Sequence, residues 1–141
     1  MSVIATAHLN FQGQARQALN FYQSVFGGQA MLVTYQQAAS ARHPADAHHI
    51  AYGQVESDNG FRIMAYDVAV GTPWQPGVNA YFVSLRGETA AEIADLWNQL
   101  SAGATIVHAL APAHWSPLYG MLKDRFGVVW VLDVRVAYAA A

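Results

Sequence analysis

Hydrophobic and polar positions alternate with two different periods, and the same order of periods occurs twice along the chain. Residues 4–11 alternate with a period of two, as a β-strand does. The polar side of this strand comprises Thr6, His8 and Asn10. Apolar residues then recur at helical spacing from Ala15 to Phe26, and Gly27-Gly28 can adopt the left-handed conformation that ends a helix. This pattern predicts a strand followed by a helix of about three turns.

Three further segments with strand-like alternation follow this helix. They cover residues 30–36, 49–56 and 61–67. The second half repeats the order, with a strand that includes Ala80 and Ser84 and a helix that begins with a capping box of Thr89 and Glu92. Its later strands are predicted at residues 105–110, 119–123 and 128–136. The sequence therefore predicts one domain of two βαβββ modules, at residues 1–70 and 78–138, with a linker at residues 71–77.

The two halves also align residue by residue, which marks the pattern as an internal repeat. Residues 52–60 match residues 119–127 without a gap, at an offset of 67 positions. Upstream, Phe11-Gln12-Gly13 matches Leu85-Arg86-Gly87 at an offset of 74 positions. Because a module of this size cannot close a core alone, we expect the two copies to pack together and to line a cavity with equivalent positions.

Composition narrows the classes of partner. The chain has 141 residues, of which 54% are hydrophobic and 11% charged, which is ample for a buried core. The net charge is −2 and the seven Lys and Arg residues are scattered, so we expect neither a nucleic acid nor a membrane as partner. The absence of cysteine excludes disulfides and thiolate chemistry. Without a basic, then apolar, N-terminal signal, a cytoplasmic location is expected.

Several segments together resemble a known family. They are His8–Phe11, Ala18–Gly28, Arg62–Asp67, Trp115–Met121 and Asp124–Trp130. These strings are similar to the PhnB-like branch of the vicinal oxygen chelate superfamily, the group of glyoxalases, bleomycin-resistance proteins and extradiol dioxygenases. The resemblance implies an α+β fold in which two βαβββ modules form a curved eight-stranded sheet around a cleft, commonly in a homodimer. Members of the branch are often labelled as 3-demethylubiquinone-9 3-methyltransferases, but no Gly-rich strand-to-helix turn that would cradle a nucleotide-like methyl donor is visible here.

The resemblance also implies where a divalent metal would be held in enzymes of the superfamily, on the first and fourth strands of both modules. The carboxylate position falls on Val131, and its repeat equivalent is Met64. Neither side chain can ligate a hard divalent ion. His8 is the one plausible ligand, and the repeat alignment pairs it with Phe82. We therefore predict no metal and no other cofactor.

A second group of candidate metal ligands lies near the extra residues of the first half. It comprises His43, Asp46, His48 and His49. Adjacent residues of a strand point to opposite faces, so His48 and His49 cannot easily converge. A surface or dimer contact is the favoured interpretation of this group, and zinc binding is the alternative.

The expected ligand-binding residues follow from alternation along the first and fourth strands of each module, together with one loop tryptophan. They are His8, Asn10, Arg62, Met64, Tyr66, Phe82, Ser84, Trp115, Val131 and Asp133. These residues would form an apolar slot with polar groups that orient a ligand, and Trp115 would serve as its lid or wall. An ion pair between Arg62 and Asp133 is an equally good interpretation of those two residues.

Three functions are compatible with this pattern. The favoured one is metal-free binding or modification of a small apolar or aromatic molecule in the cleft. The first alternative is a metal-dependent isomerase, lyase or dioxygenase that uses His8. The second is a structural or interaction homodimer whose cleft is filled by side chains. A homodimer is expected in any case, because apolar strands such as residues 128–136 would otherwise leave sheet edges exposed.

Overall fold

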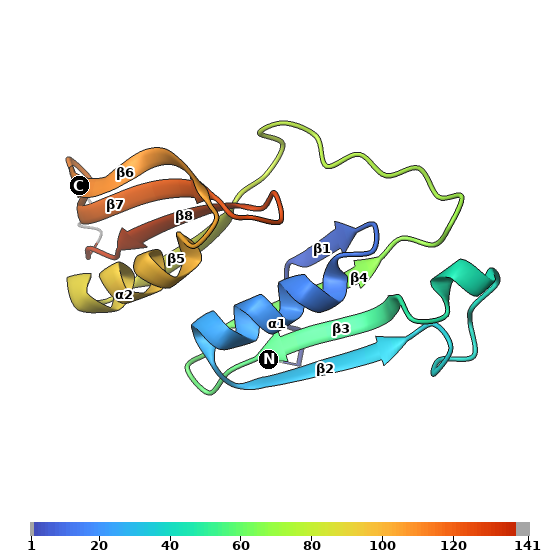
Figure 1. Ribbon diagram of the computed structural model, residues 1–141. Coiled ribbons are helices and arrows are strands. Elements are labelled where there is room, and N and C mark those ends of the chain that lie inside the picture. The colour runs from blue at the N-terminus through green and yellow to red at the C-terminus, as the bar shows by residue number, and fades with distance from the viewer. Residues whose placement is uncertain (1, 138–141) are drawn as a thin grey trace. The chain divides into compact units, whose positions relative to one another are not determined.

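The computed structural model describes residues 2–137, which form two compact units that divide between Pro76 and Gly77 (Figure 1). We call them the N-terminal unit and the C-terminal unit. Each unit contains one four-stranded sheet and one α-helix. The predicted second module ends at residue 138, which lies outside the described residues.

The N-terminal unit follows the predicted order of elements. Its elements are β1 (His8–Phe11), α1 (Ala15–Phe26), β2 (Gln29–Thr34), the 3-10 helix η1 (Pro44–Asp46), β3 (Ile50–Glu56) and β4 (Arg62–Asp67). The strands lie in the order β1-β4-β3-β2, with β1 parallel to β4 and the other pairs antiparallel. The first strand is shorter than predicted, because regular pairing with β4 begins only at His8.

The C-terminal unit repeats this topology. Its elements are β5 (Val83–Gly87), α2 (Ala90–Leu100), β6 (Thr105–Ala113), β7 (Ser116–Lys123) and β8 (Val129–Val134). The strand order is β5-β8-β7-β6, again with one parallel pair, β5 with β8. The predicted α+β class and the two βαβββ modules are thus confirmed, and the eight strands form two four-stranded sheets. The strand that suggested an exposed edge, β8, lies between β5 and β7, so that argument for a dimer was wrong and the edges of this sheet are β5 and β6.

A glycine in the middle strand of each sheet lets the helix approach closely. A Cβ atom added at Gly53 in β3 would overlap the Leu19 side chain of α1. The equivalent residue in β7 is Gly120, where a Cβ atom would lie 2.7 Å from Cζ3 of Trp97 in α2. The helix therefore covers one face of each sheet, and the apolar residues of β4 and β8 that point to this face are buried.

The two helices begin with different caps. Helix α2 has the predicted capping box, in which the Thr89 hydroxyl accepts from the Glu92 amide and Glu92 accepts from the Thr89 amide. Helix α1 has no side-chain cap of its own. Instead the Asp67 carboxylate, from the end of β4, accepts hydrogen bonds from the amides of Gly13 (2.8 Å) and Ala15 (3.0 Å). A negative charge at this position also interacts favourably with the helix dipole.

The register of the sheets corrects the predicted repeat partner of His8. His8 lies opposite Met64, and Ser84 lies opposite Val131, which is the equivalent of Met64. The counterpart of His8 is therefore Ser84, and the prediction of Phe82 was wrong. The alignment had matched Gly13 with a glycine of β5, but Gly13 is a turn residue with a φ of 96° that lies outside the strands. Phe82 precedes β5 and belongs to no strand.

We predict that Asp67→Ala lowers the free energy of unfolding by about 3 kcal/mol, because it leaves the amides of Gly13, Ala15 and Ile50 without their shared buried acceptor. Urea denaturation followed by circular dichroism measures the change. The control is Asp95→Ala on the exposed side of α2, which should change stability by less than about 0.5 kcal/mol. Equal effects of the two substitutions would contradict this account of the cap.

Candidate functional site

The face of the N-terminal sheet that α1 does not cover carries a row of four side chains, one from each strand. From β2 to β1 the row comprises Met31, Gln54, Met64 and His8. Residues directly opposite each other in adjacent strands have Cβ atoms about 5 Å apart, so these side chains are neighbours. All four are partly or fully exposed. Two thioethers therefore flank an amide on this face, with an imidazole at the end of the row.

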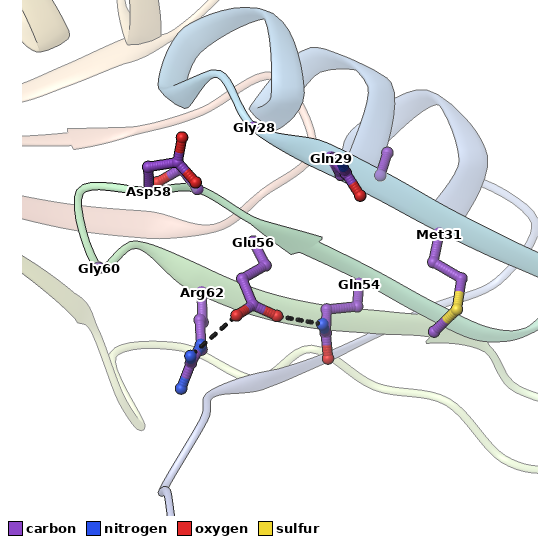
Figure 2. Close-up of a pocket in the computed structure, with 10 residues that line it drawn as sticks. Gly28, Gln29, Met31, Gln54, Glu56, Asp58, Gly60 and Arg62 are labelled. Carbon is purple, nitrogen blue, oxygen red and sulfur yellow. Dashed lines mark hydrogen bonds and ion pairs between the residues drawn. The ribbon is translucent and has the colours of Figure 1, made fainter.

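An open groove of about 850 Å³ lies at one end of this row (Figure 2). Its lining residues come from the start of β2, the end of β3, the turn that follows it and the start of β4. They are Gly28, Gln29, Ala30, Met31, Gln54, Glu56, Ser57, Asp58, Gly60 and Arg62. The volume lies within the range of about 300–1,000 Å³ that is typical of small-molecule pockets.

A short chain of polar contacts fixes the side chains in the groove. The Arg62 guanidinium donates to Glu56 Oε1 at 2.8 Å, and Gln54 Nε2 donates to Glu56 Oε2 at 3.0 Å. Figure 2 shows these side chains and Met31 pointing away from α1. Both oxygens of Glu56 are thus engaged, whereas the amide oxygen of Gln54 can still accept a hydrogen bond from a ligand.

His8 is oriented by two neighbours. Its Nδ1 lies 3.0 Å from Asn10 Oδ1, and its ring meets the ring of Tyr66 edge-on with centroids 5.2 Å apart. An amide oxygen accepts, so the tautomer that carries its hydrogen on Nδ1 satisfies this contact. In that tautomer Nε2 can accept a hydrogen bond from a ligand.

The corresponding face of the C-terminal sheet has a different chemistry. The row equivalent to that of His8 comprises His108, Met121, Val131 and Ser84. The next row comprises Ala111, Tyr119, Asp133 and Arg86. In this second row Arg86 Nε donates to Asp133 Oδ1 at 3.0 Å.

The structure confirms the predicted face for most candidate residues and corrects others. In the N-terminal unit, His8, Asn10, Arg62, Met64 and Tyr66 all lie on the face opposite α1, because their strand neighbours are buried. In the C-terminal unit, Ser84, Val131 and Asp133 share a face of the sheet. Trp115 lies in the turn between β6 and β7 and contacts Tyr119, whereas Phe82 lies outside the sheet. A ligand-binding role for these residues stays a prediction.

The anticipated ion pair between Arg62 and Asp133 was wrong. Arg62 pairs with Glu56, and Asp133 pairs with Arg86, each within its own unit. The sequence reasoning also missed Gln54 and Glu56, because only the first and fourth strands of each module were examined for site residues. The alternation of residues 49–56, which predicted β3, would have placed both on the same face as Met64.

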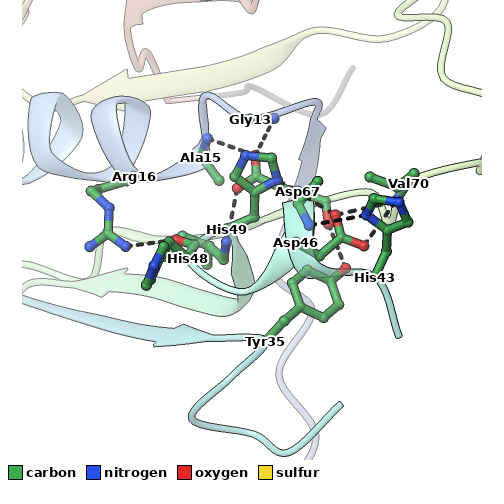
Figure 3. Close-up of polar contacts among 12 residues, drawn as sticks. Gly13, Ala15, Arg16, Tyr35, His43, Asp46, His48, His49, Asp67 and Val70 are labelled. Carbon is green, nitrogen blue, oxygen red and sulfur yellow. Dashed lines mark hydrogen bonds and ion pairs between the residues drawn. The ribbon is translucent and has the colours of Figure 1, made fainter. Parts of the chain in front are cut away.

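The segment between β2 and β3, residues 35–49, is called the insert, and its histidines and Asp46 make structural contacts (Figure 3). The buried Asp46 accepts from the Val70 amide at 3.0 Å, and His49 Nδ1 lies 3.6 Å from Asp46 Oδ1. His43 Nδ1 accepts from the Ala45 amide. His48 contributes its carbonyl oxygen, which accepts from the Arg16 side chain at 2.9 Å. Among the described residues, no three His, Cys, Asp or Glu side chains are grouped so that they could hold a metal ion. These contacts attach the insert to α1 and to the segment after β4.

A buried tyrosine adds a second attachment between the insert and β4. The Tyr35 hydroxyl donates to the Asp67 carbonyl oxygen at 2.6 Å. Burial raises the pKa of Tyr35 above its ordinary value of 10.0, and the nearby Tyr66, Asp46 and Asp67 raise this pKa further. The neutral phenol is therefore the form that the fold stabilises.

Residues 4–132 match the model of the family described as 3-demethylubiquinone-9 3-methyltransferase. No curated protein matches the chain. No helix within residues 2–137 has the length and apolar character that crossing a membrane requires.

Solved structures with the same fold come from several bacteria. Protein PA1353 from Pseudomonas aeruginosa is 28% identical, with 95% of this chain and 98% of that chain covered and a TM-score of 0.82. A putative 3-demethylubiquinone-9 3-methyltransferase, PhnB protein, from Bacillus cereus is 24% identical, with 94% and 100% covered and a TM-score of 0.75. A glyoxalase/bleomycin resistance protein/dioxygenase family enzyme from Burkholderia phytofirmans is 18% identical, with 94% and 100% covered and a TM-score of 0.62.

The raised pKa of Tyr35 predicts a loss of stability at alkaline pH. In the unfolded chain the phenol ionises near pH 10, whereas in the folded chain it keeps its proton to a higher pH. The folded state therefore binds more protons above pH 10, and the free energy of unfolding falls as the pH rises through this range. Urea denaturation between pH 8 and about pH 11.5 should show a steeper fall for the unmodified protein than for Tyr35→Phe. Tyr81→Phe, at an exposed tyrosine, should retain the steep fall.

Proposed function

Because the chain belongs to the family described as 3-demethylubiquinone-9 3-methyltransferase, within the PhnB-like branch of the glyoxalase, bleomycin-resistance and dioxygenase superfamily, we propose that it binds a small apolar or aromatic molecule without a metal. The binding site is the uncovered face of the N-terminal sheet. The apolar part of the ligand lies on the methionines of the central row, and its polar group contacts Gln54, Arg62 or His8.

The observation that supports this proposal is the groove itself, in which the exposed apolar side chain of Met31 lies beside the hydrogen-bonded side chains of Gln54, Glu56 and Arg62. Met31 is 46% exposed and lines the groove beside Gln54. Covering a methionine side chain with a ligand contributes up to about 1.5–3 kcal/mol, and its flexible thioether adapts to ligands of different shape. The contacts that join Arg62, Glu56 and Gln54 hold the polar groups in place before a ligand arrives, so less entropy is lost on binding.

The residues at the implied metal positions do not fit a divalent ion. The resemblance places carboxylates where this chain has Met64 and Val131, and a thioether and an isopropyl group do not ligate hard divalent ions. The first strands contribute His8 and its true counterpart Ser84. One imidazole on an exposed strand does not make a metal centre, because catalytic sites commonly use three protein ligands.

The helix N-termini do not fit a nucleotide-like methyl donor either. Such a cofactor would use free amides at a glycine-rich strand-to-helix turn. The amides of Gly13 and Ala15 at the start of α1 are taken by the Asp67 carboxylate. At the start of α2, the amide of Glu92 is taken by the Thr89 hydroxyl. These caps support binding rather than methyl transfer as the function of the described chain.

We predict that Met31→Glu weakens binding of the uncharged aromatic probe N-phenyl-1-naphthylamine by about tenfold or more, because it places a carboxylate against the apolar part of the ligand. Fluorescence titration measures the affinity, and amide chemical shifts should change at Met31, Gln54 and Met64 when the probe binds to the unmodified protein. Val3→Glu, which adds the same charge at an exposed residue of the N-terminal unit, is the control. Absence of saturable binding, or equal affinities for the two variants, would refute the proposed site.

We also propose that the protein is a homodimer. Strand β6 is an edge of the C-terminal sheet, and it exposes two apolar side chains, Ile106 and Val107. Exposed apolar edge strands favour association with another chain.

Light scattering on the protein as it elutes from a size-exclusion column at micromolar concentration should therefore give the mass of a dimer. Val107→Glu should shift the measured mass toward that of the monomer. Val136→Glu changes another exposed valine of the same unit outside the sheet and should leave the mass unchanged. A monomeric unmodified protein would refute the dimer, and an unchanged dimer of Val107→Glu would exclude β6 as its interface.

A further inference from the structure

The face of the C-terminal sheet that α2 does not cover changes its chemistry from one edge to the other. Strand β5 contributes the exposed polar residues Ser84 and Arg86. The central strands contribute one apolar pair, Val131 from β8 opposite Met121 from β7, and beside it Asp133 opposite Tyr119. The far side is aromatic, with Tyr119 on β7 and His108 on β6.

Arg86 is held in one orientation but keeps most of its donors available. Its Nε donates to Asp133 Oδ1 at 3.0 Å, and its side chain is 52% exposed, compared with 12% for Asp133. Within residues 2–137, no hydrogen bond engages the terminal amino groups of Arg86. These two groups form the planar fork that binds carboxylates and other oxyanions in a bidentate manner. Asp133 thus fixes a guanidinium whose outer edge faces solvent.

Three aromatic rings meet at the other side of the same face. The Tyr119 ring contacts His108 edge-on at a centroid distance of 5.0 Å, and it contacts Trp115 in the same manner at 5.1 Å. Trp115 is nevertheless 57% exposed in the turn between β6 and β7. Large aromatic side chains gain stability mainly through burial, so an indole that is oriented by Tyr119 but left exposed offers a surface on which a planar ring can pack.

From these observations we propose that the uncovered face of the C-terminal sheet binds a planar aromatic anion. The anionic group binds to the fork of Arg86, the ring packs against Tyr119 and Trp115, and the part between them crosses β8 over Asp133, whose carboxylate Arg86 already engages, with Val131 beside it in the next row. Arg86 and Tyr119 lie two strands apart, which corresponds to about 10 Å. An aromatic acid with two fused rings and a short acidic arm has the length required to reach both ends.

The exposed charges on this face favour an anion over a cation. Asp133 is nearly buried and is already paired with Arg86. Lys123, on the same face of β7, is exposed. The accessible charges are therefore positive, and their repulsion disfavours an ammonium group beside the aromatic cluster. This site uses residues of the C-terminal unit alone, whereas the groove is lined by residues of the N-terminal unit.

The test compares three ligands of one shape and different charge: 2-naphthylacetate, its neutral amide and 2-naphthylethylammonium. Isothermal titration calorimetry on the full chain should give the highest affinity for the anion, and the Trp115 indole and Tyr119 amide resonances should shift. Arg86→Gln should lower the affinity for the anion by about tenfold and leave that for the amide unchanged, because only the anion uses the fork. Trp115→Ala should weaken both ligands. Arg42→Gln, which removes a charge from the insert of the other unit, is the matched control.

A second variant separates ligand contact from a structural role of the ion pair. Asp133→Asn breaks the same pair but leaves the guanidinium charged, so the anion should bind at least as tightly as to the unmodified protein. Loss of anion binding in Asp133→Asn as well as in Arg86→Gln would overturn the proposal, because the pair would then act through the fold. Equal affinities for the three ligands, or resonance shifts confined to the N-terminal groove, would also overturn it.

Discussion

The close contact between each helix and one glycine of its sheet is the constraint on which the rest of the structure depends. A side chain at Gly53 or Gly120 would collide with the helix that packs above it. Because the helix thereby occupies one face of the sheet, every second residue of the strands next to the middle of the sheet, such as β4 and β8, is buried beneath it, and the residues between them point to the opposite face. The chemistry of the molecule is concentrated on these opposite faces. The repeated glycine thus fixes which side chains are available to a ligand before any of them makes a contact.

The two copies keep this arrangement but differ in what they place on the uncovered face. Glu56, which organises the polar groove of the N-terminal unit, is replaced by Lys123 at the equivalent position of the C-terminal unit. Tyr66, which contacts His8, is replaced by Asp133, which holds an arginine. The same scaffold therefore presents a groove organised around a carboxylate in one unit and accessible positive charge with aromatic rings in the other. The two copies thus share the helix packing and differ in the side chains on the uncovered face.

Alternation along the chain predicted much of the fold, because a period of two determines which residues of a strand share a face. Alternation cannot distinguish two registers that differ by two residues, since such a shift keeps every side chain on the same face. Phe82 and Ser84 differ by such a step, so only the observed pairing with Val131 could decide between them. The partner of Arg62 was missed for a different reason: alternation does not show which residue of the neighbouring strand lies opposite, and that residue is Glu56. Contacts of the insert, such as that of Asp46 with Val70, link distant segments and leave no periodic signal.

The corrected register also changes the set of side chains at the positions where the resemblance implies metal ligands. The counterpart of His8 is Ser84 rather than Phe82, so the set of equivalent positions includes a hydroxyl. The set then offers an imidazole, a hydroxyl, a thioether and an isopropyl group. A neutral hydroxyl is a weak ligand, and the two positions where carboxylates would neutralise the charge of an ion remain Met64 and Val131. The same apolar groups are favourable for a ligand that is itself apolar, since covering them releases water from their surfaces. The uncharged side chains of Met64 and Val131 therefore disfavour a divalent ion and favour an apolar ligand for the same physical reason.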